Sequence, residues 1–151
     1  MDNSGLKLLL YFGYGAMLKG LCSDGVNEDF HQKALKYFDG DSSLENDIAD
    51  DVYVEFPHAT RRLIEMSREK NIDRFSGENV HSYVYEIHGR EVLPSCAVLS
   101  GRVKNVFSDK KIVEIERDKE IFEINYLLSL ESTFSIGDEV YFHQGWLIPK
   151  K

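Results

Sequence analysis

Cysteine is scarce in this chain of 151 residues, which contains only Cys22 and Cys96. Two cysteines are too few for the disulfide framework of a small secreted domain. The sequence also has no Cys-x-x-Cys or His-x-x-x-His spacing, so it does not predict a closed zinc site within one helix or strand. If these cysteines act chemically, we expect them to act as thiolates.

Proline is scarce as well, and long apolar runs are absent. Three prolines, with 42% hydrophobic and 29% charged residues, are typical of a globular chain with a packed core. The longest apolar run near the start, Leu8 to Phe12, is far shorter than the ~20 residues of a membrane-spanning helix. It also lacks the basic flank and the cleavage site of a signal peptide. We therefore expect a cytoplasmic protein with no membrane partner.

Basic residues are in the minority. The chain has 18 Lys and Arg against 26 Asp and Glu, a net charge of −8 and a pI of about 5.1. Nucleic-acid binding needs Lys and Arg to neutralise phosphates, so this balance argues against a nucleic-acid partner. Residues 1–92 have ten basic and seventeen acidic residues, whereas residues 93–151 have eight and nine, so the acidity belongs to the first part.

The pattern of side chains changes between Gly89 and Pro94. Before this point apolar residues recur mainly at helical spacing, and after it they follow the spacing of strands. The length allows one ordinary domain or two small ones. We therefore expect an α+β chain with a helical region over residues 1–92 and a β-barrel over residues 93–151.

Two helices in the first region have clear start signals. Asn27 is the expected N-cap of a helix that ends at Gly40. Pro57 suits the first turn of a second helix, which continues through Arg68. Between them, residues 39–51 are rich in Asp, Ser and Asn, and we expect a loop or a short irregular helix there.

Two other segments of this region are compatible with more than one structure. Residues 6–18 are apolar with two internal glycines, which fits either a helix or a strand followed by a turn. Residues 79–87 combine alternating tyrosines with apolar residues at helical spacing, so they fit a helix or a strand.

The second region has segments rich in β-branched and aromatic residues, which predict four or five short strands. They are residues 97–107, 112–116, 121–126 and 139–148. Gly137-Asp138 is expected to form a turn in which the glycine has a positive φ. Carboxylates alternate with apolar side chains in residues 113–116 and 121–124, so these strands should have one wet and one buried face. So small a sheet needs to close into a barrel or pack against helices, and we expect both.

Two short signatures lie about forty residues apart in this region. The first is Cys96 followed by Gly101-Arg102-Val103, and the second is Gly137-Asp138-Glu139-Val140 with His143-Gln144-Gly145-Trp146. Together they resemble the hydrogenase-assembly chaperones of the HypC/HupF family, over about residues 95–149. The resemblance implies a small OB-like antiparallel β-barrel. The family's cysteine becomes the second residue of its chain and a proline precedes its glycine, whereas here Cys96 is internal and Ser100 precedes Gly101.

The resemblance also implies a function. In that family the cysteine thiolate is understood to bind iron with cyanide and carbon monoxide ligands, together with a partner protein, before delivery to a nickel–iron hydrogenase. It would make Cys96 the iron or partner contact and His143 a nearby auxiliary group. Thiolate suits low-spin iron, and imidazole can ligate the metal or hold the thiolate by a hydrogen bond. The leading hypothesis is a non-catalytic, chaperone-like protein of metal-centre assembly with iron as cofactor and a protein as partner.

The N-terminal glycines and Cys22 carry two further resemblances. Tyr11-Phe12-Gly13-Tyr14-Gly15 through Gly20-Leu21-Cys22 is similar to the N-terminal helical region of an uncharacterised prokaryotic family with a comparable C-terminal barrel. If both cysteine loops face one cleft, Cys22, Cys96 and His143 could form a soft metal site. The segment from Tyr11 to Gly15 also resembles the substrate loop that follows the first strand of γ-glutamyl cyclotransferases.

Two other classes of function stay open. One is a small-molecule enzyme with Cys22 or Cys96 as nucleophile and His143 as base, in a pocket between the helical part and the barrel. The other is an interaction module in which acidic residues 39–51 contact a basic partner. Cys96, His143 and Trp146 also fit ordinary core positions.

Overall fold

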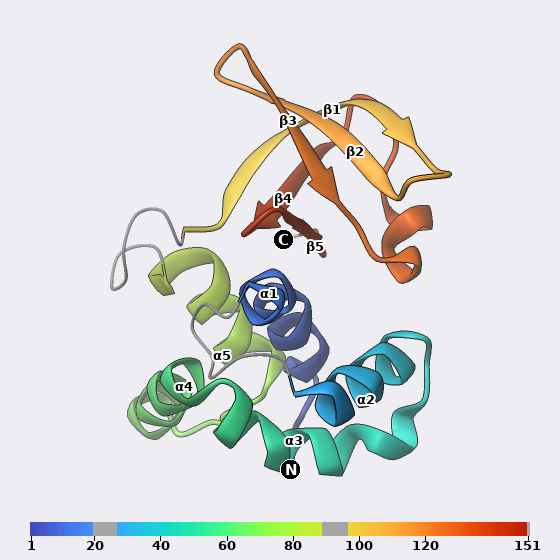
Figure 1. Ribbon diagram of the computed structural model, residues 1–151. Helices are drawn as coiled ribbons and strands as arrows, with labels where there is room; N and C mark the ends of the chain where they lie inside the picture. The colour runs from blue at the N-terminus through green and yellow to red at the C-terminus, as the bar shows by residue number, and fades with distance from the viewer. Residues whose placement is uncertain (20–26, 89–96, 151) are drawn as a thin grey trace. The chain divides into compact units, whose positions relative to one another are not determined.

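The computed structural model describes residues 1–19, 27–88 and 97–150. The chain divides into two compact units, Met1–Ile87 and His88–Lys151. The first is helical and the second contains a β-barrel, so the chain has an α+β architecture (Figure 1). The residues from Gly89 to Pro94, where the sequence predicts the boundary, lie outside the described residues.

The described residues of the helical unit form α-helices, one 3₁₀-helix (η1) and one π-helix (η2). These elements are α1 (Leu6–Leu18), α2 (Glu28–Phe38), η1 (Ser42–Leu44), α3 (Glu45–Glu55), α4 (Pro57–Lys70), α5 (Gly77–Ser82) and η2 (Tyr83–Ile87). Both segments that were compatible with helix or strand are therefore helical. No helix in the described ranges combines the length and the apolar character needed to cross a membrane.

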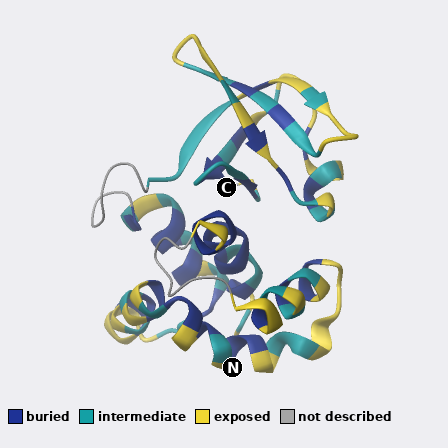
Figure 2. Cartoon of the chain, viewed as in Figure 1, coloured by how far each residue is buried: buried dark blue, intermediate teal, exposed yellow. Residues whose placement is uncertain are grey.

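Helix α1 is buried on almost every side. All residues from Leu9 to Met17 are buried, as is typical of a helix in the centre of a core (Figure 2). A Cβ atom at Gly13 would lie 2.7 Å from the Cε1 and Cζ atoms of Phe56. Glycine is therefore needed at position 13 because the aromatic ring packs directly against the helix backbone.

The predicted helix signals are confirmed. The Asn27 side chain accepts hydrogen bonds from the backbone N–H groups of Asp29 and Phe30, at 3.1 and 3.3 Å. Helix α2 ends at Phe38, and Gly40 follows with a φ of 106°. Pro57 is the first residue of α4.

The expectation of a loop or short irregular helix over residues 39–51 is wrong from Glu45 onward, because α3 is a regular helix of 11 residues. Its buried side chains Ile48, Ala49 and Val52 occupy one helix face. The acidic side chains in its first turn interact favourably with the positive end of the helix dipole, which stabilises the helix. Burial of this apolar face outweighed the turn preference of Asp and Asn.

The described residues of the second unit form five strands that close into a barrel in the order β1-β2-β3-β5-β4. The strands are β1 (Leu99–Phe107), β2 (Ile112–Arg117), β3 (Glu120–Asn125), β4 (Glu139–His143) and β5 (Trp146–Ile148), with the 3₁₀-helix η4 (Leu128–Thr133) between β3 and β4. The prediction of four or five strands in a small barrel is confirmed. In β2, Val113 and Ile115 are buried while Glu114 and Glu116 are partly exposed, which confirms the predicted alternation.

The barrel is mixed and not purely antiparallel, so that part of the expectation is wrong. Four strand pairs are antiparallel, whereas β3 and β5 are parallel through the pair Asn125–Trp146. The reason is the odd number of strands. Directions cannot alternate all the way around a closed ring of five strands, so at least one pair must be parallel.

Candidate functional site

The two signatures contribute residues to neighbouring strands: Gly101 to Val103 lie on β1, and Glu139, Val140 and His143 lie on β4. Strand β1 pairs with β4 in antiparallel register, with Leu99 opposite Phe142 and Gly101 opposite Val140. At the other end of this pairing, the Val103 N–H donates to the Asp138 carbonyl and the Gly137 N–H donates to the Val103 carbonyl, both at 2.9 Å. The fold therefore brings segments far apart in the sequence side by side.

Gly101 makes close strand packing possible. A Cβ atom at this position would collide with Cγ2 of Ile115 and would lie 2.8 Å from the carbonyl oxygen of Glu116. Both residues belong to β2, the other neighbour of β1. The glycine of the first signature thus has a structural role in the barrel.

The second signature begins with a turn. Gly137 has a φ of 95°, which confirms the predicted positive value. The Asp138 carboxylate accepts hydrogen bonds from Lys150 Nζ at 2.9 Å and from the Ser135 N–H at 3.0 Å. These two bonds, the Lys150 bond first, hold the pKa of Asp138 below its usual range. Asp138 therefore stabilises the turn as a carboxylate.

His143 lies at the end of β4 and is only 1% exposed. It pairs with Trp146 across a turn in which Gln144 and Gly145 have φ values of 53° and 83°. The turn is tied to β3, because the Asn125 N–H donates to the Gly145 carbonyl at 2.9 Å. The backbone that carries the His143 imidazole is thus fixed by its pairing with β5 and by the bond from its turn to β3.

A second imidazole lies against His143. The rings of His88 and His143 have centroids 5.5 Å apart and planes at 81°, and His88 is only 2% exposed. His88 is the first residue of the second unit. His88 was not predicted from the sequence, because it belongs to neither signature; its place eight residues before Cys96 is the one sequence feature that connects it with them.

The other predicted site residues, Cys22 and Cys96, lie outside the described residues. The predicted Cys22–Cys96–His143 metal site, and the enzyme site built on the same residues, therefore stay predictions. Within the described ranges, no group of three or more His, Cys, Asp or Glu side chains is arranged to hold a metal ion. The expectation of iron as a cofactor likewise stays a prediction.

The resemblance to a cyclotransferase substrate loop is not supported by the backbone. That loop follows a strand, whereas Tyr11 to Gly15 lie inside α1. The Tyr14 hydroxyl is hydrogen bonded to Nε2 of His31 at 2.8 Å. Burial, and then the charge of Glu28, raises the pKa of Tyr14, so it stays a neutral phenol.

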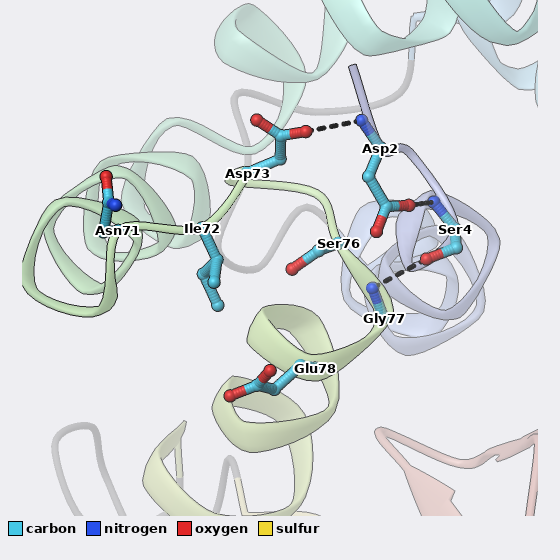
Figure 3. A pocket seen from close by; sticks show the side chains of 8 residues that line it. All are labelled: Asp2, Ser4, Asn71, Ile72, Asp73, Ser76, Gly77 and Glu78. Carbon is cyan, nitrogen blue, oxygen red and sulfur yellow. Dashed lines mark hydrogen bonds between the residues drawn. The ribbon is translucent and has the colours of Figure 1, made fainter.

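One pocket of the helical unit, of about 490 Å³, collects carboxylates from Asp2, Asp73 and Glu78 (Figure 3). The Asp2 N–H donates to Oδ2 of Asp73 at 2.6 Å, and the Asp2 carboxylate accepts from the Ser4 N–H at 2.9 Å. Oγ of Ser4 in turn accepts from the Gly77 N–H at 2.8 Å. These groups fasten the start of the chain to the start of α5, so this pocket has a structural explanation.

Comparison with known proteins gave no match, whether to family models, to curated proteins or to solved structures. Function must therefore be inferred from the residues of the two signatures and from the histidine pair.

Proposed function

We propose that this chain is a non-catalytic, chaperone-like binding protein of metal-centre assembly, related to the proteins of hydrogenase maturation. Cys96 contacts iron or a protein partner, and His143 assists it. The observation that carries the proposal is the pairing of β1 with β4, which brings the described residues of the two signatures together on one small closed barrel.

The register of these strands supports a joint role for Cys96 and His143. Leu99, the first residue of β1, follows Cys96 by three residues, and it pairs with Phe142, the residue before His143. Three residues of chain span at most about 11 Å. So short a connection to the strand beside His143 favours one site for both residues.

The chemistry of the two side chains supports the same role. A thiolate is a soft ligand that suits low-spin iron, and an imidazole can bind the same metal or orient the thiolate by a hydrogen bond. A binding protein needs to hold such a metal and release it to a partner, which does not require a catalytic base. The partner is accordingly a metalloenzyme or one of its maturation factors.

Iron binding by cysteine variants tests the proposal. The full chain is purified anaerobically with a thiol reductant, incubated with Fe²⁺ and desalted, and the retained iron is measured for wild type, Cys96→Ala and Cys22→Ala. We expect Cys96→Ala to lose iron by at least about tenfold, because it removes a metal ligand. Cys22→Ala is the matched control and should retain it.

The same proteins are then used as bait for a candidate maturation partner. Weaker capture by Cys96→Ala than by Cys22→Ala would support Cys96 as a partner contact. Equal iron content and equal partner capture in wild type and Cys96→Ala would refute the proposed role of the thiolate.

A further inference from the structure

We propose that His88 and His143 together hold a divalent first-row transition metal ion in the second unit. The proposal deepens the proposed function, on which it rests for the role of this region, and it adds His88 as a metal ligand. It starts from the contact of two buried imidazoles that are 55 positions apart in the sequence and that meet with centroids 5.5 Å apart.

The separation of the rings fits a shared metal ion. Imidazole nitrogens bind such ions at about 2.0–2.1 Å, and two imidazoles at a tetrahedral metal therefore have ring centroids about 5 Å apart. The observed 5.5 Å is close to this value. The planes meet at 81°, so the rings are not stacked face to face.

The elements that carry the two histidines suit a functional site. His143 ends a strand whose following turn is fixed by backbone bonds, so its ring starts from a well-held position. His88 directly follows the π-helix η2 (Tyr83–Ile87) in the chain. Isolated π-helical turns are rare and occur frequently at functional sites.

The ligand type and number indicate which metal is held and how. Imidazole suits zinc, copper, iron and nickel, whereas magnesium and calcium prefer oxygen ligands. Two imidazoles supply half of a tetrahedral set, and no third His, Cys, Asp or Glu joins them within the described part of the chain. The ion therefore keeps positions for other ligands, which is the property of a site that exchanges its metal and not of a closed structural site.

The test uses the wild-type full chain labelled with ¹⁵N and titrated with Zn²⁺ under reducing conditions. Long-range ¹H–¹⁵N spectra report the imidazole nitrogens directly. We expect one nitrogen of His88 and one of His143 to shift together and to saturate at one equivalent of Zn²⁺. His58, which is exposed on α4, is the internal control and should not move. Unchanged His88 signals at saturating Zn²⁺ would overturn the proposal, leaving the two rings as core packing only.

The Zn²⁺ affinity of histidine variants provides a second test. His88→Gln should weaken Zn²⁺ binding by at least about tenfold, and His58→Gln should leave it unchanged. Thermal unfolding shows whether His88→Gln is folded, and the wild-type spectra decide the question if it is not.

A Co²⁺ titration of the same protein separates this proposal from the proposed function. A thiolate-to-cobalt charge-transfer band that is lost in Cys96→Ala, with no shift at His88, would support the cysteine role and refute the histidine pair. Shifts at both histidines that persist in Cys96→Ala, with no such band, would support the histidine pair and refute the cysteine role.

Discussion

Gly101 in β1 lies so close to Ile115 in β2 that a side chain at position 101 has no room. Gly101 also pairs with Val140 of β4, so β1 has close neighbours on both of its edges. The close packing of β1 in the barrel is therefore sufficient to explain the glycine of the first signature.

We predict that Gly101→Ala destabilises the barrel by about 1–3 kcal/mol, because the methyl group must displace Ile115 or the β2 backbone. Urea unfolding followed by circular dichroism measures the change. Ser100→Ala in the same strand is the matched control and should change the free energy of unfolding by less than about 0.5 kcal/mol. Equal stabilities for Gly101→Ala and this control would show that β1 can move away from β2.

Asn27 joins two parts of the helical unit. It caps α2 through its Oδ1 atom, and its Nδ2 atom donates to Oε1 of Glu55, which is buried, at 2.9 Å. Asn27→Ser should keep a cap and lose only the bond to Glu55. Asn27→Asp also keeps a cap, but it places a second carboxylate beside Glu55, which raises carboxyl pKa values. We therefore expect Asn27→Asp to be less stable than Asn27→Ser at pH 7. At pH 5 the stability of Asn27→Asp should rise towards that of Asn27→Ser, and thermal unfolding at both pH values measures the difference. A pH-independent difference would contradict this.

Much of the fold was predictable from local signals. Asn27, Pro57 and Gly137 each occupy a position whose backbone geometry or hydrogen bonding favours that residue type. Val113 and Ile115 alternate with carboxylates because β2 has one face in the barrel. Signals of this kind depend on neighbours in sequence, and they locate elements well.

Other features depend on the tertiary structure and were missed. Helix α3 begins inside a stretch rich in Asp, Ser and Asn, and its stability comes from buried Ile48 and Val52. The parallel pair in the barrel follows from the count of strands in a closed ring. The contact of His88 with His143 joins residues 55 positions apart, and no periodicity connects them.

Asp138 gives a prediction about acid stability. Its folded-state pKa is lowered by Lys150 and by the Ser135 N–H, so the unfolded chain takes up this proton first as the pH falls. The contribution is complete above the unfolded value near 3.8 and is lost as the pH falls through the lower folded value. We expect the stability of Asp138→Asn to fall less steeply than that of wild type below pH 4. Urea midpoints between pH 2 and pH 6 measure this, with exposed Asp109→Asn as control. If the urea midpoints of wild type and Asp138→Asn fall in parallel with pH, the protonation of Asp138 is not coupled to folding.

Tyr126 gives the corresponding alkaline prediction. It is buried, its hydroxyl donates to Oε1 of Glu131 at 3.0 Å, and burial followed by this bond raises its pKa. The unfolded tyrosine ionises near pH 10 while the folded one stays neutral, so this stabilising contribution is lost as the pH rises. Tyr126→Phe should lower the free energy of unfolding by about 1 kcal/mol at pH 7. Above pH 10 the difference in free energy of unfolding between wild type and Tyr126→Phe should become smaller. A constant gap from pH 7 to pH 11, in urea unfolding, would refute the link.

Gly13 and Phe56 form a pair whose coupling can be measured. Gly13→Ala gains up to about 1 kcal/mol of helix propensity. Its methyl group would lie 2.7 Å from the Phe56 ring, which is 4% exposed, and such overpacking costs about 1–3 kcal/mol. We therefore expect Gly13→Ala alone to destabilise the helical unit.

The matched background is Phe56→Leu, which removes the ring carbons that meet the new methyl group. In that background Gly13→Ala should be neutral or stabilising, because only the propensity gain remains. A double-mutant cycle by urea unfolding should then give a coupling energy of about 1–3 kcal/mol. Additive effects would show that the ring and α1 adjust independently, and that close approach of Phe56 to the backbone is not what requires glycine at position 13.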